Sequence, residues 1–192
     1  MARSRVCVLR TWRPDDEEWY AGLVANPRVM RYIGDGTPRS RARAAAEIRG
    51  FREETRVRGW SRWVVETAGR VPAGYVGFSV RDGRVDWGGR CLPRFWGTPM
   101  ILDAAILALR TGLRSCGITR AEATTVLENR GAWRLNQALG FRTIEHYAEG
   151  GIVMIRQEIL RADDCDERWR SLEARMAGST SSLRSACRGA GA

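Results

Sequence analysis

Residues 94–100, RFWGTPM, lie between a predicted strand and a strongly apolar helix. Gly97 permits a tight turn, and a loop that opens a helix often binds phosphate through its backbone N–H groups. Pro99 has no backbone N–H, although proline suits the first turn of a helix. The stretch can therefore be an anion-binding loop, a weakened one or a simple turn.

Short strands and helices alternate on both sides of this loop. A first helix opens at residues 13–18 and is broken by Asn26-Pro27, and a second begins after Ser40. The pair Asp82-Gly83 is typical of a hairpin between two strands. This order predicts a single mixed α/β domain, with strands over 6–10, 60–66, 73–80, 84–92, 118–126, 141–147 and 152–159 and further helices over 41–57, 99–115 and 131–139.

The chain of 192 residues is long enough for one domain with a hydrophobic core, which we place at residues 1–160. Residues 161–192 form a polar C-terminal extension. A polar helix is predicted over 163–176, and the stretch from 178, rich in Gly, Ser and Arg, is predicted to be disordered.

The net charge of +10 comes entirely from arginine, because the sequence contains no lysine. Such a bias fits GC-rich coding, and a basic surface for an acidic partner is the alternative. No motif for nucleic acid is present, so we do not expect that partner. No apolar run is long enough for a membrane span or a secretory leader, and a cytoplasmic location is expected.

Cysteine and histidine give little support for a metal or nucleophile site. The five cysteines (Cys7, Cys91, Cys116, Cys165 and Cys187) form no CxxC pair, and His146 is the only histidine. An odd number of unpaired cysteines predicts neither a disulfide framework nor a zinc site. No GxSxG motif accompanies the histidine.

Three strings in order resemble the GNAT acetyltransferase superfamily, and most closely its RimJ/RimL-type branch, known for acetylating protein N-termini. They are NPRVMRYI at 26–33, LPRFWG at 92–97 and ENRGAWRLNQALGF at 128–141. The resemblance implies a central, mostly antiparallel sheet that is splayed in the middle and flanked by helices. It also implies transfer of an acyl group from acetyl-CoA to a primary amine.

The family's loop pattern is Arg or Gln, two residues, Gly, one residue, then Gly or Ala. Arg94 and Gly97 match it, whereas Pro99 does not. The lost bond to a charged pyrophosphate would cost about 1.5–3 kcal/mol, roughly a ten- to hundredfold loss of affinity. The residues implied in donor binding are Leu92, Arg94, Phe95, Trp96, Gly97, Thr98, Met100, Asn129 and Trp133.

Asp86 stands where this branch often has a catalytic glutamate, so the resemblance implies that it accepts the proton of the amine. The alternative is an aspartate paired with one of the many arginines. Asn129 would contact the pantetheine arm, or else cap the following helix. Many family members have a tyrosine as general acid where this sequence has Asn136, whose amide cannot protonate a thiolate.

Tyr32, Trp87 and His146 are the residues implied in acceptor binding. The acceptor is a protein N-terminus or a small-molecule amine, and the protein is a monomer or a homodimer. The altered loop also leaves open another donor, such as an acyl group on an acidic carrier protein. A non-catalytic binding module with the GNAT fold is the remaining alternative.

Overall fold

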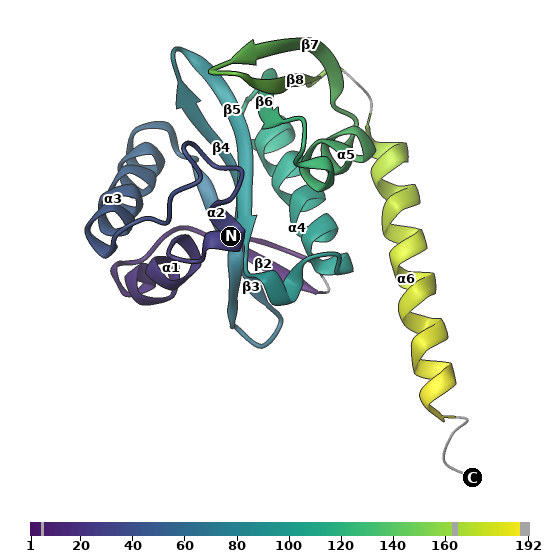
Figure 1. Cartoon of the computed structure of the whole chain (residues 1–192). Coiled ribbons are helices and arrows are strands. Elements are labelled where there is room, and N and C mark those ends of the chain that lie inside the picture. The colour runs from purple at the N-terminus through teal and green to yellow at the C-terminus, as the bar shows by residue number, and fades with distance from the viewer. Residues whose placement is uncertain (5, 163–164, 189–192) are drawn as a thin grey trace.

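The computed structural model describes residues 1–4, 6–162 and 165–188. Its centre is one sheet in the order β1-β2-β3-β4-β5-β6-β8-β7 (Figure 1). Within the described ranges only β5 and β6 are parallel neighbours, so the mixed, mostly antiparallel sheet is confirmed. The strands are β1 (Ala2–Arg3), β2 (Cys7–Arg10), β3 (Arg62–Thr67), β4 (Pro72–Arg81), β5 (Arg84–Cys91), β6 (Arg120–Val126), β7 (Arg142–Glu149) and β8 (Ile152–Leu160).

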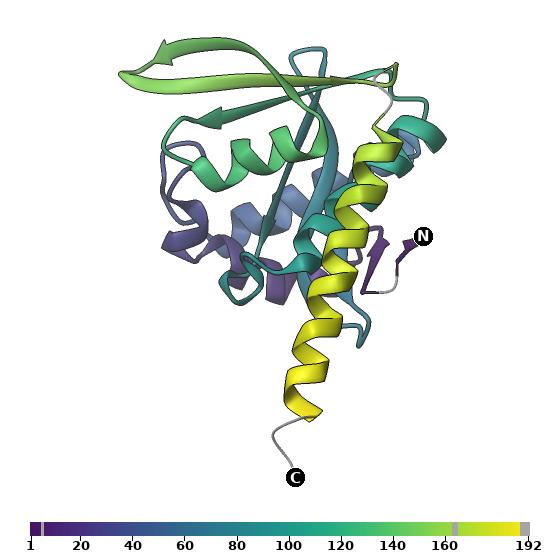
Figure 2. The same cartoon turned by 90° about the vertical axis from the view of Figure 1, so that its right-hand side faces the viewer.

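Helices cover both faces of the sheet (Figures 1 and 2). One face carries α1 (Glu17–Val24), α2 (Pro27–Met30) and α3 (Arg41–Arg58), and the other carries α4 (Pro99–Arg110), α5 (Arg130–Leu139) and α6 (Asp166–Arg188). None of the described helices is both long and apolar enough to cross a membrane.

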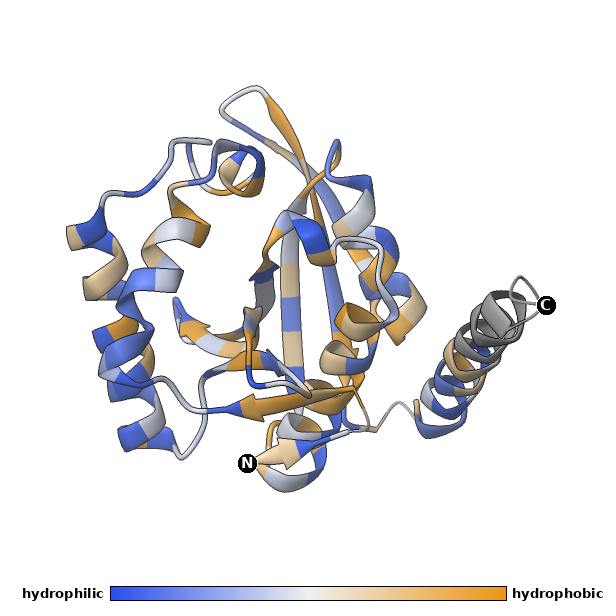
Figure 3. Ribbon diagram, turned by 90° about the horizontal axis from the view of Figure 1, so that it is seen from below, coloured by the Kyte–Doolittle hydropathy of each residue, from blue (hydrophilic) through white to orange (hydrophobic). Residues whose placement is uncertain are grey.

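The two faces bury separate hydrophobic cores. Tyr20, Met30 and Phe51 pack on one side of the sheet, whereas Phe78 and Leu109 pack on the other. Hydrophilic residues dominate α3, at the left of Figure 3. Only Ala44, Ile48 and Phe51 of α3 are buried, so this helix turns a narrow apolar side inward, whereas α4 is apolar over much of its surface.

Local signals placed most elements correctly. Ser40 accepts a hydrogen bond from the Arg43 amide and begins α3, and Asp82 and Gly83 both have positive φ in the hairpin. Asn26-Pro27 does more than break the first helix: Asn26 accepts a hydrogen bond from the Arg28 amide, so the pair also begins α2. The two-residue β1 was missed, since it is too short to show a periodicity.

The C-terminal extension is more ordered than predicted. The polar helix begins at Asp166, but it continues to Arg188 through the stretch expected to be disordered. Alanine, leucine and arginine in that stretch favour helix; residues 163–164 and 189–192 lie outside the described part. The start of the extension packs on the domain, because Trp169 is buried and its Nε1 donates to the Leu139 carbonyl at 2.8 Å.

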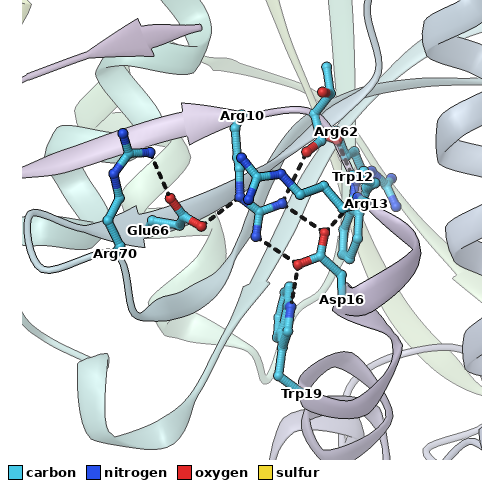
Figure 4. A network of polar contacts seen from close by, with 9 residues as sticks. Arg10, Trp12, Arg13, Asp16, Trp19, Arg62, Glu66 and Arg70 are labelled. Atoms are coloured by element: carbon cyan, nitrogen blue, oxygen red, sulfur yellow. Dashed lines mark hydrogen bonds and ion pairs between the residues drawn. The ribbon is translucent and has the colours of Figure 1, made fainter.

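A buried ionic network joins β2, β3 and the entry to α1 (Figure 4). Arg10 donates to both oxygens of Asp16 at 2.7 Å and to Glu66 at 2.6 Å. The Asp16 carboxylate also accepts from the indole of Trp19 at 2.7 Å. Burial alone would raise the pKa of Asp16, but the bonds from Arg10, Trp19 and the Arg13 backbone hold it below its usual range.

Arg10→Gln should destabilise the protein by about 3–5 kcal/mol, because it leaves two carboxylates buried without their cation. Arg70→Gln is the matched control, since Arg70 contacts the same Glu66 from a side chain that is 57% exposed. That change should cost about 0–1 kcal/mol. Urea unfolding measures both.

The loss of unfolding free energy in Arg10→Gln should depend on pH. Asp16 has a depressed pKa in the folded protein, so its contribution is present above its unfolded pKa and is lost as the pH falls through the folded value. The difference between wild type and variant should therefore shrink below about pH 4. A difference that stays constant down to about pH 2 would contradict the ionic origin of the effect.

Candidate functional site

The strands β5 and β6 separate after a single paired position. Asp86 pairs with Glu122 near the start of both strands, and no further pair joins them in the described chain. Because the strands are parallel, both then diverge toward their carboxyl ends. Residues 92–98 follow β5 and Asn129 follows β6, so the predicted splay is confirmed and two of the predicted donor-binding segments flank it.

The loop after β5 is a tight turn in which several backbone N–H groups stay unpaired. The amides of Phe95, Trp96 and Thr98 donate to carbonyls within the loop at 2.9–3.2 Å. Gly97 has φ of 71° and nothing near its missing Cβ, a conformation that favours glycine. The amides of Arg94, Gly97 and Met100 have no acceptor among the described residues.

Pro99 is the first residue of α4, as expected from its position. Thr98 is extended, with φ of −84° and ψ of 151°, which is the effect expected of the following proline. The Thr98 hydroxyl donates to the Phe95 carbonyl at 2.8 Å and makes no cap. The helix start is thus intact although one amide is missing.

Positive charge surrounds the loop. The Arg94 guanidinium lies 4.9 Å from the Phe95 ring centroid, and that of Arg28 lies 5.3 Å from Trp96. Trp96 is 43% exposed, and its Nε1 donates to the Cys91 carbonyl at 3.0 Å. Guanidinium groups and free amides at a helix start are the groups that bind phosphate.

Asn129 occupies the N-cap position of α5, but its side chain makes no cap hydrogen bond. Its backbone carbonyl accepts from the Ala132 amide at 3.1 Å instead. The sequence allowed the Asn129 side chain to cap α5, but this hydrogen bond is not observed. Trp133, one turn on, is half-buried and fixed by a 3.0 Å bond from its Nε1 to the Leu127 carbonyl.

Asp86 lies on the α1–α3 face of the sheet and forms an ion pair with Arg62. The pairing with arginine, one of the two alternatives for this residue, is thus observed. Burial raises the pKa of the Asp86 carboxyl, and the neighbouring Arg62 and Arg81 only partly offset this. A carboxylate with a raised pKa is a stronger base than an exposed one.

Trp87 points to the opposite face, into the core, and begins a chain of hydrogen bonds. Its Nε1 donates to Asn136 at 3.2 Å, and the Asn136 amide donates to Gln157 at 3.1 Å. Gln157 in turn donates to the Trp133 carbonyl at 3.2 Å. We call these four residues the β5–β8 brace, since it joins β5 to α5 and β8 across the diverging strands.

Tyr32 and His146 are not brought together with Asp86 by the sheet. His146 is exposed on the edge strand β7, pairs with Ile155 and is separated from β5 by two strands, at least about 14 Å. Tyr32 is half-buried in the turn after α2, with the Arg31 guanidinium 5.1 Å from its ring.

The sequence profile described as "Acetyltransferase (GNAT) domain" matches residues 7–142. The chain belongs to the GNAT acetyltransferase family. By this match it is a GNAT-type N-acetyltransferase, and solved acetyltransferases share its fold.

A GNAT-family acetyltransferase from Bacillus anthracis has a TM-score of 0.73 at 18% identity, over 84% of this chain and 99% of that one. The acetyltransferase from Agrobacterium tumefaciens has a TM-score of 0.69 at 14% identity, over 80% and 91%. The spermidine N-acetyltransferase of Vibrio cholerae was solved with CoA and spermine. It has a TM-score of 0.65 at 18% identity, over 81% of this chain and 96% of that one.

The cysteines of this GNAT domain are not activated as nucleophiles. Cys91 ends β5 beside the loop, and burial raises its pKa to about 11, partly offset by Trp96. Burial also raises the pKa of Cys116. A thiol with a raised pKa is mostly protonated at neutral pH and reacts slowly.

Sequence reasoning missed several polar residues around Asp86 in the GNAT domain, above all Arg62, Arg90 and Glu47. Side chains alternate between the two faces of a strand, so the sequence could have placed Arg62 on the same face as Val64. In the same way it could have placed Asp86 on the same face as Arg90. The pairing of β3, β4 and β5 that brings these faces together is non-local, and no residue pattern within one strand reveals it.

Asn136→Leu should destabilise this GNAT domain by about 1–3 kcal/mol, because it leaves the polar atoms of Trp87 and Gln157 buried and unpaired. Gln137→Leu, on the exposed side of the same helix, should change stability by about 0.5 kcal/mol or less. A double-mutant cycle with Gln157→Leu should show a coupling of about 0.5–3 kcal/mol. Additive losses would contradict a connected brace.

Proposed function

We propose that the protein transfers an acetyl group from acetyl-CoA to a primary amine, and that the donor binds where β5 and β6 diverge. The observation that carries this proposal is the loop after β5, which offers free amides at Gly97 and Met100 beside Arg94. Oriented N–H groups and a guanidinium at a helix start suit the pyrophosphate of CoA.

The remaining contacts to the donor are proposed from the position of residues beside the diverging strands. Divergence of β5 from β6 leaves the backbone edge of β5 available to the amide groups of the pantetheine arm. Asn129, whose side chain is free of a cap bond, faces the same arm from the end of β6. Leu92, Phe95, Trp96, Thr98 and Trp133 complete the proposed donor site.

Acetyl-CoA supplies a thioester carbonyl that an amine attacks in one step. Asp86 accepts the proton of the amine, directly or through a water, and its raised pKa suits this role. Asn136 cannot act as the acid for the leaving thiolate, since both ends of its amide are engaged in the β5–β8 brace. A thiolate leaves without an acid more readily than an alkoxide does.

The acceptor is a protein N-terminus, as in the RimJ/RimL-type branch, or a small amine. Tyr32 is a proposed contact for either acceptor, whereas His146, on β7, could reach only the longer one, a protein N-terminus. Trp87 is a weaker candidate than the sequence suggested, because its side chain is buried against the core. We also propose a cytoplasmic protein, monomeric or homodimeric, with no membrane partner.

Pro99 supports a second candidate: an acyl carrier protein as donor, or a binding module without catalysis. Both would follow if the loop had lost its affinity for CoA. The unpaired amides that remain favour the enzyme with CoA as donor over these alternatives.

Pro99→Ala should tighten the binding of acetyl-CoA by about tenfold or more, because it restores an N–H at the start of α4. Isothermal titration calorimetry measures this directly. Pro14→Ala is the control, since Pro14 also begins a helical turn but lies before α1. Failure of the wild type and of Pro99→Ala to bind millimolar acetyl-CoA would overturn the proposed donor.

Asp86→Asn should lower kcat by about 10²-fold or more and leave the affinity for acetyl-CoA unchanged. In the wild type, kcat/KM should rise with pH through the pKa of Asp86, which burial raises above the ordinary value. This rise of kcat/KM with pH should be absent in Asp86→Asn. Asp82→Asn, in the exposed hairpin, should keep wild-type rates; full activity of Asp86→Asn would remove Asp86 from the mechanism.

A further inference from the structure

Three arginines on the α1–α3 side of the sheet each carry a buried N–H with no acceptor in the part of the chain that is described. The atoms are Nε of Arg39, Nε of Arg62 and Nη1 of Arg90. Buried donors in folded proteins are almost always paired, and an unpaired one costs free energy. A cluster of three therefore indicates a group that accepts these bonds when the protein is at work.

Arg62 and Arg90 form the inner part of the cluster. Their side chains are only 9% exposed, and their guanidinium carbons lie 5.9 and 5.7 Å from the Tyr75 ring centroid. Gly88 lies between Asp86 and Arg90 on the same face of β5, and a Cβ there would be 3.4 Å from Nη2 of Arg62. The missing side chain leaves room for the Arg62 guanidinium above the strand.

The nearby carboxylates do not satisfy these donors. Glu47 lies 3.8 Å from Arg39 and 3.7 Å from Arg90, too far for hydrogen bonds, and it accepts a 2.5 Å bond from Tyr20 instead. The Asp86 carboxylate accepts a hydrogen bond from Nη2 of Arg62, which is not one of the three unpaired atoms.

The charges of the cluster do not cancel. Glu54 is bound by the Ser61 hydroxyl and the Val80 amide. In the described part of the chain, Arg39, Arg43, Arg62 and Arg90 face Asp35, Glu47, Glu54 and Asp86, and the excess positive charge comes from Arg81 near Asp86.

We infer that the acceptor is a small amine that also carries a carboxylate, as an amino acid does. The inference rests on the proposed function, which places the amine beside Asp86. The carboxylate then accepts hydrogen bonds from Arg62 and Arg90, and charge-assisted bonds of this kind are strong. A polyamine is disfavoured, since its second ammonium would lie among four arginines.

The test uses pairs of amines in which one member carries a carboxylate and the other carries the corresponding amide. Alanine and alaninamide form one pair, and 4-aminobutyrate and 4-aminobutanamide form another, with butane-1,4-diamine as the dication. Calorimetry with CoA present measures binding, and thiol release from acetyl-CoA measures turnover. At least one carboxylate should bind about tenfold or more tightly than its amide, and the diamine should bind most weakly.

Arg90→Gln should remove the preference for the carboxylate and leave the amide and CoA affinities unchanged. Arg49→Gln changes the net charge equally from the exposed side of α3 and should keep the preference. Equal binding of acid and amide, tighter binding of the diamine, or no binding of either acid would overturn the inference. Absence of CoA binding would instead overturn the proposed function, so the two failures are distinct.

Discussion

The divergence of β5 from β6 is the constraint on which the rest of the structure depends. The two strands share one paired position, at Asp86 and Glu122, and a sheet interrupted in this way would lose cohesion if nothing else joined its halves. The β5–β8 brace supplies that connection through Trp87, Asn136 and Gln157. Its polar groups are satisfied by one another, which is the condition under which a buried network is tolerated.

The brace also explains a departure from the family pattern. Asn136 stands where many GNAT enzymes have a tyrosine that acts as an acid. Here it is 7% exposed and both ends of its amide are engaged, so the position contributes to the fold and is closed to proton transfer. The proposed chemistry lies on the other face of β5, where Asp86 and the arginines are found.

Two buried ionic clusters differ in how well they are satisfied. Arg10 is fully engaged by Asp16 and Glu66, whereas the arginines beside Asp86 keep unpaired N–H groups. Buried ion pairs often stabilise a fold no better than apolar residues of the same size would. A cluster that also leaves donors unpaired is better explained by binding than by stability.

Local rules predicted what depends on neighbours along the chain. The cap at Ser40, the turn at Asp82-Gly83 and the start of α4 at Pro99 all follow from a few adjacent residues. The partners of Asp86 and Asn136 could not be predicted in this way, because they come from strands and helices 24 and 21 to 49 residues away. The resemblance to the family suggested residues 92–98 as the donor loop, which stays a proposal, and it carried no information on the arginines around Tyr75.

Hydrogen exchange with and without acetyl-CoA tests the central claim most directly. At a saturating concentration, exchange should slow in and around the proposed donor site, at residues 87–92, 96–102 and 127–133, and stay unchanged in α3 and in the β7–β8 hairpin. Saturated binding with no slowing in β5 and its following loop would contradict the account, since the donor would then lie away from the diverging strands.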